Sequence, residues 1–323
     1  GVSFLLGRGR RPFGTSRPDA ALALSRSPTP AAYRNALKQR ATASRAVARR
    51  EATTLKGLMT LRLATWNINS VRLRIDQVAR FVKEAKIDVL CLQEIKCLED
   101  QFPRNAFVDM GLPHLKIAGQ KGWHGVAIAS RLPIEASDTF NACKLGHARC
   151  VSARIAGIDI QNFYIPAGGD VPDRELNPKF DHKMDFYEQL TATITAQDRA
   201  SKLLICGDFN IAPSEFDVFN HKFMLKVVSH TPGEIETLNR LQQAGGFFDV
   251  VRDAYPEPQK LASWWSYRAQ DFRKSARGLR LDHIWTSPGL TPSVVAKSAV
   301  IHEPVRAWEQ PSDHCPITVD LDV

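Results

Sequence analysis

Two apolar runs, IDVLCLQE at residues 87–94 and SKLLICGDFN at residues 201–210, each deliver an acidic residue at their end, Glu94 and Asp208. The runs are almost continuously apolar, so they predict strands that are buried and have no polar face. Buried strands are rigid, and an acid at the end of such a strand points into a crevice where ligands commonly bind. The likeness of the two runs also hints at two similar halves.

Strands and helices alternate along the rest of the chain from Met59 onward. Further strands are predicted at residues 61–68, 114–120, 124–130, 150–157, 158–166, 279–287, 294–300 and 316–323. Amphipathic helices are predicted at 74–86, 178–197 and 234–246, and an irregular stretch at 97–113. The mixture of hairpins and helix-linked buried strands predicts an α/β (α+β) fold, in which two mostly antiparallel mixed sheets pack face to face and helices cover the outside.

The positive charge of the chain is concentrated in its first 58 residues. The 323 residues carry a formal net charge of +9, but residues 1–58 hold twelve Lys and Arg against Asp19 and Glu51, which leaves about −1 for residues 59–323. Net charge therefore gives no support for DNA binding by the larger part. We expect a single catalytic domain at 59–323, preceded by a basic, disordered extension or by translated sequence upstream of Met59. A mitochondrial transit peptide is the alternative.

The cysteines are predicted to be structural thiols in a reducing compartment. They form no Cys-x-x-Cys pair and show no paired Cys/His spacing typical of zinc sites. Several lie in apolar strands, where cysteine behaves as a small hydrophobic residue. The six are Cys91, Cys97, Cys143, Cys150, Cys206 and Cys315.

The acids at the strand ends suit metal-assisted hydrolysis. An uncompensated carboxylate at Glu94 is costly, so it needs a cation, and Mg²⁺ prefers oxygen ligands. Asp208 and Asn210 lie two residues apart and face the same side if the chain is extended. Asp208 can then take a proton from water while the amide of Asn210 holds that water or the phosphate.

A second group of polar residues surrounds one histidine. His314, in PSDHCPI, can donate to a phosphoryl oxygen if Asp282 fixes its tautomer. Asn67 and Asn69 follow a strand that delivers them to the same rim, and Tyr164 ends another strand. Each of these residues alone has an ordinary structural interpretation as a turn or core residue. A structural role is the interpretation we adopt for His124, His147, His221, His230 and His302.

The ordered set Asn, Glu, Tyr, Asp-x-Asn, Asp, Asp-His resembles the exonuclease III family of apurinic/apyrimidinic endonucleases, in the wider group of magnesium-dependent phosphoesterases. The resemblance runs from Met59 to the end, through LRLATWNINSVRLR, CLQEIK, GQKGWHGVAI, CGDFNIAP, SWWSYR, RGLRLDHIWTS and SDHCPI. It implies a four-layer sandwich and Mg²⁺, with Mn²⁺ as a substitute. It further implies hydrolysis 5′ to an abasic site, together with 3′-phosphodiesterase and 3′-5′ exonuclease activity.

The resemblance also implies roles for residues at matching positions. Glu94 is similar to the principal Mg²⁺ ligand. Asp208 is similar to the group that activates water, and Asn210 to its positioning partner. Asp282 with His314 is similar to the pair that contacts the phosphate. Asn67 and Tyr164 are similar to supports of the developing charge. Asn69 stands where some relatives carry a metal-binding Asp, and Ala167 where relatives often carry Asn or Gln. The implied metal-binding set is Glu94, Asn67, Asp208, Asn210, Asp313 and His314.

Basic residues beside aromatic ones are predicted to grip DNA, because this combination suits phosphate contact plus stacking or wedging at an extruded sugar. A solvated loop is the ordinary alternative for such a run. The segment between residues 268 and 280 also contains Phe272 and Arg280. The predicted DNA-binding residues are Arg72, Arg74, Lys96, Lys121, Trp264, Trp265, Arg268, Arg273, Lys274 and Arg277.

The expected partner is duplex DNA with abasic or 3′-blocked sites, bound by a monomer without a membrane. A cytoplasmic, nucleoid-associated location is expected, or a mitochondrial one if residues 1–58 are a transit peptide. Three other functions remain open. They are a phosphatase of the same fold acting on lipid or inositol phosphates, a nonspecific DNase or RNase, and a nucleic-acid-binding protein without activity. Clustered acids without a metal destabilise a fold, which argues against the last.

Overall fold

The computed structural model describes residues 59–135, 139–268 and 271–323, so the predictions for segment 1–58 lie outside the described residues. Two large sheets dominate this part. The first has six strands in the order β12, β13, β1, β2, β4, β3, spanning Val300–Ile301, Ile317–Asp322, Thr60–Asn67, Val89–Gln93, Val126–Ser130 and His114–Ala118. The second has five in the order β5, β6, β7, β11, β8, spanning Cys150–Ile155, Ile158–Tyr164, Leu203–Asp208, Asp282–Thr286 and Phe248–Asp249.

The helices and a small two-stranded sheet complete the described elements. The small sheet pairs β9 with β10, Trp264–Trp265 and Gly278–Leu279. The α-helices α2 to α8 span Ile75–Ala85, Arg104–Asp109, Pro178–Thr195, His221–Met224, Pro232–Gly245, Val250–Ala254 and Phe272–Ser275. The short 3₁₀ helices η1 to η4 span Glu99–Gln101, Glu215–Asp217, Thr291–Ser293 and Glu303–Ala307. In the described part, no helix has both the length and the apolar character that crossing a bilayer demands.

Each large sheet contains one parallel pair of strands, and the remaining pairs are antiparallel. The parallel pairs are β1 with β2 and β6 with β7. Helix α2 connects the first pair and α4 connects the second, so that each sheet is built around a β-α-β unit. The two apolar runs singled out in the sequence, β2 and β7, occupy the same position in their units. This equivalence supports the hint of two similar halves.

Apolar side chains join the two sheets face to face. Leu63, Cys91 and Ile128 of the first sheet form one buried cluster with Ile160 and Cys206 of the second. Burial of apolar area of this kind contributes about 25 cal/mol per Å². Because both strands of a parallel pair are covered on the other side as well, β2 and β7 are buried along their whole length.

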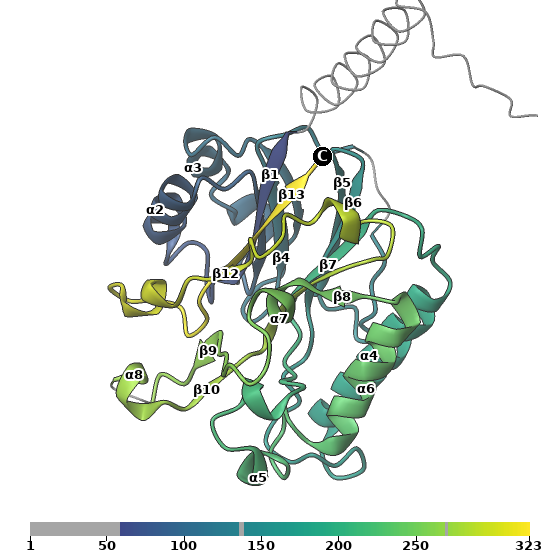
Figure 1. Cartoon of the computed structure of the whole chain (residues 1–323). Helices are drawn as coiled ribbons and strands as arrows, with labels where there is room; N and C mark the ends of the chain where they lie inside the picture. The colour runs from purple at the N-terminus through teal and green to yellow at the C-terminus, as the bar shows by residue number, and fades with distance from the viewer. Residues whose placement is uncertain (1–58, 136–138, 269–270) are drawn as a thin grey trace, which may run out of the picture. The chain divides into compact units, whose positions relative to one another are not determined.

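Helices cover the outer faces of both sheets. Phe81 of α2 and Phe107 of α3 pack with Trp66 on the outside of the first sheet. Phe186 of α4 and Leu241 of α6 do the same on the second. In Figure 1, α2 and α3 lie on one side of the sheets, and α4 and α6 lie on the opposite side. The predicted four-layer arrangement is confirmed.

A tight turn joins β5 and β6, which correspond to the strands expected at residues 150–157 and 158–166. Ala156 and Gly157 are its two central residues, with φ values of 50° and 74°. Positive φ at both positions is the signature of a type I′ turn, whose twist matches that of an antiparallel hairpin. The hairpin sets the register that places Tyr164 at the far end of β6, opposite Asp208 of β7.

Two local predictions were wrong. The stretch 97–113 is not wholly irregular, because α3 forms within it. Phe107 is buried against the first sheet, and its burial stabilises a helix too short to be recognised by periodicity. The strand expected at 294–300 is reduced to β12. Lys297 adopts a φ of 58°, a left-handed conformation that ends any extended run.

Candidate active site

The predicted catalytic residues lie where strands of the two sheets end. Asn67 is the last residue of β1, Glu94 follows β2, and Tyr164 and Asp208 end β6 and β7. The carboxyl ends of the two strands in a parallel pair meet at one edge of their sheet. Strand β11 runs antiparallel to β7, so its first residue, Asp282, pairs directly with Asp208. Topology thus gathers residues far apart in the sequence.

The side-chain amide of Asn67 links the two sheets at this edge. Its Nδ2 donates to Glu94 Oε1 over 2.9 Å and to Asp208 Oδ2 over 3.0 Å. One amide nitrogen therefore holds two carboxylates, one from each sheet, within about two hydrogen-bond lengths of each other. Asn67 is itself fully buried, and its backbone oxygen accepts from Ser312 Oγ over 2.6 Å.

His314 lies between two acids. Its Nδ1 is 2.8 Å from Asp282 Oδ2, and its Nε2 is 3.7 Å from Asp208 Oδ2. Ser263 Oγ also donates to Asp282 Oδ2 over 2.6 Å, which fixes that carboxylate. The backbone oxygen of His314 accepts from Trp66 Nε1 over 3.1 Å. The predicted pairing of Asp282 with His314 is therefore present, with Nδ1 bound to the acid and Nε2 directed toward Asp208.

Burial and charge shift the pKa values of this group. Burial alone lowers the pKa of His314, but the negative charges of Asp282 and then Asp208 outweigh it and raise that pKa to about 10. Burial raises the pKa of Asp208 to about 7, against the opposing charge of His314. Burial, with the charges of Glu94 and Asp208, holds the pKa of the Tyr164 phenol well above its usual value, so Tyr164 stays protonated and can donate.

Asn210 reaches the site in a conformation that the sequence analysis did not foresee. Strand β7 ends at Asp208, and Asn210 has a φ of 55°, so the two residues do not share one face of an extended strand. The backbone N–H of Asn210 donates to Asp208 Oδ1 over 3.0 Å. Its Nδ2 donates to the backbone oxygen of Ile165 over 2.9 Å, which points the amide nitrogen into the protein.

Glu94 lies beside a cation of the protein itself. Lys96 Nζ is 2.9 Å from Glu94 Oε2 and also bonds Asn69 Oδ1. Glu94 and Lys96 have φ values of 51° and 52°, a conformation that is costly for residues with a side chain. Such local strain is concentrated at functional sites, where it aims side chains. Lys96, predicted to contact DNA, is in this structure a partner of the predicted metal ligand.

Asp313 completes the rim of the site. Its Oδ1 accepts from Asn69 Nδ2 over 3.1 Å and its Oδ2 from Trp264 Nε1 over 3.0 Å. Burial tends to raise the pKa of Asp313, but the charge of His314 and these two hydrogen bonds hold it below its usual value. Asp313 is therefore a fixed, ionised carboxylate bonded to Asn69 and Trp264 in the same cavity as Glu94.

These groups open into one cavity of about 640 Å³. Its polar end is formed by Glu94, Tyr164, Asp208, Asn210, Asp313 and His314. Its apolar wall comes from the loops after β7 and β10, with Phe219, Phe223, Met224, Val227, Leu279 and Leu281 among its residues, and Trp264 closes one side. Arg268 and Arg277 also line it. A cavity lined by acids together with apolar and basic groups suits a sugar-phosphate ligand.

Comparison with known proteins agrees with this arrangement. Residues 64–314 match the Endonuclease/Exonuclease/phosphatase family. The chain belongs to this family. It is 31% identical to exodeoxyribonuclease III of Haemophilus influenzae, over 81% of this chain and 100% of that protein. It is 29% identical to the DNA repair nuclease APEX1 of Danio rerio, over 81% of this chain and 83% of that protein.

Solved structures of the family superpose on the fold. A 3′-5′ exonuclease from Neisseria meningitidis has a TM-score of 0.74 at 30% identity, and an AP endonuclease from Archaeoglobus fulgidus has 0.74 at 31%. In both comparisons 81% of this chain covers 100% of the other. A 3′ phosphatase from Neisseria, solved with a product DNA hairpin, has a TM-score of 0.74 at 30% sequence identity, with the same coverage. The resemblance to the exonuclease III family is confirmed, and the chain is a hydrolytic nuclease by family.

The donor set of the site fits a hard metal ion, and the family is metal-dependent. The carboxylates of Glu94 and Asp208 converge on Asn67 Nδ2, and the carboxylate of Asp313 accepts from Asn69 Nδ2. The amide oxygens of Asn67 and Asn69 accept from the Asn69 N–H and from Lys96 Nζ. Ligand atoms of Asp208, Asp282 and His314 all lie within 4.8 Å of one another. Oxygen-rich sets of this kind suit Mg²⁺ or Mn²⁺ rather than a thiophilic ion.

Some predicted DNA-binding residues are exposed. Arg268 and Arg277 line the cavity, and Trp264 forms part of its side. Four more are exposed without lining it, namely Arg72, Lys121, Arg273 and Lys274.

Three other basic or aromatic residues of the predicted DNA-binding segments are buried, which corrects that prediction. Arg74 donates to the backbone oxygens of Ile68, Asn69 and Gln310. Trp265 packs edge-on against Phe272, which is also buried, with ring centroids 5.2 Å apart. Arg280 donates to Asp217 and Asp249 with almost no exposed surface. In each case the side chain that was expected to contact DNA is instead bound or packed inside the protein.

Several residues in or near the segments that form the site were not predicted from the sequence. Arg149 is buried, donates to the Tyr164 backbone oxygen over 3.0 Å, and places its guanidinium 4.7 Å from the Tyr164 ring centroid. Phe223 in the cavity wall is 58% exposed, and Trp123, next to Lys121, is 75% exposed. The exposed aromatic in the basic GQKGWHG segment was a usable signal, because large apolar side chains in solvent commonly mark binding sites.

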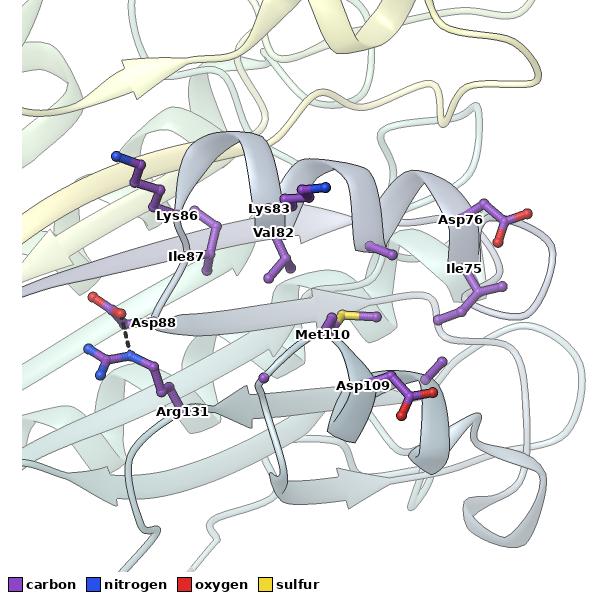
Figure 2. A pocket seen from close by; sticks show the side chains of 13 residues that line it. Ile75, Asp76, Val82, Lys83, Lys86, Ile87, Asp88, Asp109, Met110 and Arg131 are labelled. Atoms are coloured by element: carbon purple, nitrogen blue, oxygen red, sulfur yellow. Dashed lines mark hydrogen bonds and ion pairs between the residues drawn. The ribbon is translucent and has the colours of Figure 1, made fainter.

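A second cavity of about 680 Å³ lies away from these groups, between α2 and α3 (Figure 2). Ile75 and Val82 of α2 and Met110 form its apolar part. The ion pair of Asp88 with Arg131, 2.7 Å long, lies at one end. None of the predicted site residues lines it. The chemistry therefore belongs to the cavity at the strand ends.

Proposed function

We propose that this protein is a DNA repair nuclease that hydrolyses the phosphodiester bond 5′ to an abasic site in duplex DNA, acting as a monomer with Mg²⁺. It also removes 3′-blocking groups and 3′ nucleotides. Its relatives are named for exonuclease, AP endonuclease and 3′ phosphatase activity. One observation carries the proposal: the Asn67 amide that holds Glu94 and Asp208 together beside the Asp282–His314 pair.

Proton transfer in this mechanism belongs to Asp208 and His314. Asp208 takes a proton from the attacking water, which is directed in line with the scissile bond. His314, kept protonated by Asp282, donates its Nε2 proton in a hydrogen bond to a phosphoryl oxygen as negative charge builds up there. The protonated Tyr164 phenol donates to the same developing charge. Cleavage leaves a 3′-hydroxyl and a 5′-deoxyribose phosphate.

Glu94 is the principal ligand that would hold the metal, with Asp313 and the oxygens of Asn67 and Asn69 as further donors. Bound Mg²⁺ supplies positive charge to the phosphoryl oxygens and orients the phosphate. Lys96 now neutralises Glu94 over 2.9 Å, and its flexible stem allows it to move aside toward a phosphate. Asn67 acts through the two carboxylates that it positions, because its amide hydrogens are used by them.

The apolar wall of the cavity suits an abasic sugar. A nucleotide without a base presents a small deoxyribose that can rotate out of the duplex at low cost. Phe219, Met224 and Leu281 offer it an apolar surface next to the acids. A nucleotide that carries a base is larger than an abasic sugar, so the cavity is expected to bind the abasic nucleotide in preference to an intact one. Arg268 and Arg277 are placed to contact the flanking phosphates.

The central test is nicking of a duplex with a single abasic analogue. With Mg²⁺ we expect a cut 5′ to the lesion, and with EDTA none. Glu94→Ala is expected to lose the activity, whereas Glu84→Ala, an exposed acid on α2, keeps it. Unchanged nicking by Glu94→Ala contradicts the metal assignment. Equal cleavage of intact duplex, RNA or a soluble phosphoester contradicts the proposed substrate.

The pH dependence of kcat/KM is expected to be bell-shaped at fixed free Mg²⁺. Below about pH 7, Asp208 is protonated because burial raises its pKa, so it cannot accept a proton and activity falls. Above about pH 10, His314 loses the proton that it donates, and activity falls again. Asp282→Asn removes the charge that most raises the His314 pKa and shifts the alkaline limb to lower pH. If the alkaline limb does not move in this variant, the loss of activity at high pH comes from a group other than His314.

DNA affinity is expected to depend on the two arginines of the cavity. Arg268→Ala with Arg277→Ala removes two phosphate contacts, which lowers the slope of log Kd against log salt by about 2. Arg240→Ala is the matched control, because Arg240 lies exposed on α6, outside the cavity. Fluorescence anisotropy with labelled abasic duplex at several salt concentrations measures the slope. Equal slopes for the double variant and the control show that these arginines do not contact phosphates.

A further inference from the structure

Three side chains outside the catalytic cavity form a cluster of a different chemistry. Cys143 and His147 come from the loop before β5, and His182 comes from the first half of α4. Their ligand atoms all lie within 4.8 Å of one another, and Cys143 Sγ is 3.1 Å from His182 Nε2. Cys143 and His182 are only 6% and 7% exposed. The other group of this kind among the described residues belongs to the catalytic site.

The loop itself presents two of these side chains to the same place. The N–H of Gly146 donates to the Cys143 oxygen over 2.9 Å, and the N–H of Cys143 donates to Asn141 Oδ1 over 3.1 Å. These bonds close a turn in which Cys143 and His147 are four residues apart. The turn directs both side chains to one place, a histidine from a helix joins them, and Cys and His are the ligands that Zn²⁺ prefers in proteins. The third ligand is distant in sequence, which is why the spacing of the cysteines and histidines did not indicate it.

Two buried polar atoms around the cluster have no hydrogen-bond partner in the described structure. They are His147 Nδ1 and Oδ2 of Asp185, which lies one turn after His182 on α4. A buried polar atom without a partner costs about 1–3 kcal/mol, so each calls for an occupant. The Asp185 carboxylate lies one turn from His182 on α4, and its other oxygen, Oδ1, is 3.6 Å from Lys144 Nζ. A carboxylate beside a ligating histidine is the usual support of a metal site.

We propose that Cys143, His147 and His182 form a second metal site, which takes one thiophilic divalent ion such as Zn²⁺. A thiolate and two imidazoles select such an ion, whereas the oxygen donors around Glu94 select Mg²⁺ or Mn²⁺. Cys143 Sγ and His182 Nε2 need to separate by roughly 0.5 Å to reach tetrahedral coordination. This change is small for a loop side chain.

The site ties the loop to α4 and is linked to Tyr164 of the catalytic site through ring contacts. His147 stacks on His124, with ring centroids 4.5 Å apart, and the His124 ring is 6.2 Å from that of Tyr164. The loop leads directly to Arg149, which contacts Tyr164 through its guanidinium and its backbone oxygen. The bound ion therefore fixes the segment that supports one wall of the catalytic site. The ion takes no part in the hydrolysis.

The test uses Co²⁺ as a probe, because a cobalt–thiolate bond gives a charge-transfer absorption that oxygen ligands do not give. Full-length protein stripped of metal is titrated with Co²⁺ and then with Zn²⁺. We expect one equivalent of Co²⁺ to produce the thiolate band and Zn²⁺ to abolish it by displacement. Glu94→Ala keeps the band, which separates this site from the catalytic one and makes the result independent of the proposed nuclease activity.

Variants decide whether these three residues are the ligands. Cys143→Ser is expected to lose the band, and His147→Gln to weaken Co²⁺ binding at least tenfold. His221→Gln, in a histidine pair elsewhere, is the matched control and keeps it. Zn²⁺ should raise the Tm of the wild type more than that of His147→Gln at the same concentration. Absence of the band in the wild type, or its persistence in Cys143→Ser, overturns the proposal. If Cys143→Ser does not fold, full-strength binding by the half-buried His147→Gln overturns it as well.

Discussion

Asp208→Asn is expected to lower kcat by about 10³-fold, because the amide cannot accept the proton of the attacking water. The exchange preserves shape, and the single amide oxygen of Asn can keep the bond from the Asn210 N–H, whereas Asn67 Nδ2, which donates to the other carboxylate oxygen in the wild type, loses its acceptor there. Single-turnover nicking of an abasic duplex at saturating Mg²⁺ measures the loss. Asp100→Asn, at an exposed acid in η1, is the control and should match the wild type.

The same variant is expected to be more stable than the wild type. Burial raises the pKa of Asp208 to about 7, so the folded state disfavours the carboxylate relative to the unfolded chain. The ionised group therefore costs stability above pH 7, and the neutral amide removes that cost. A metal-free thermal melt at pH 8 should show a higher Tm for Asp208→Asn. A lower Tm together with lost activity indicates general damage to the fold rather than loss of the base.

The sequence predicted the gathering of the site because strand ends and register follow from local patterns. Continuous apolar runs mark β2 and β7 as central strands, and acids directly after such runs must lie at the sheet edge. Pairing of Asp282 with His314 followed from the chemical need of a histidine for an orienting acid. These inferences needed no knowledge of distant contacts.

Residues whose role depends on distant backbone atoms could not be read from local patterns. Arg280 lies in a basic segment, yet two acids from separate loops, Asp217 and Asp249, bury it. Asn210 has a left-handed backbone that no local pattern specifies. The sequence showed no third metal ligand for Cys143 and His147, because the fold places His182 of α4 beside them. In each case the deciding interaction is tertiary.

Lys183 illustrates the same limit, because the helical spacing places it on the buried face of α4 but its charge suggests solvent. It is fully buried, and its Nζ donates to the Asn210 oxygen over 2.7 Å, to the Ala167 oxygen over 3.2 Å and to Glu234. Glu234 in turn accepts from the N–H groups of Ser229 and Thr231. One ammonium group thus holds two loops of the catalytic cavity at fixed positions.

Lys183→Met is accordingly expected to cost about 3–5 kcal/mol of unfolding free energy, because it leaves the Glu234 carboxylate buried without its partner. Urea denaturation measures the loss, and Lys179→Met, on the exposed part of α4, is the matched control. Adding Glu234→Gln removes the unpaired charge and should restore much of the stability. Activity should stay low in the double variant, because the tether to Asn210 is still missing. Full activity at restored stability shows that the tether does not position Asn210.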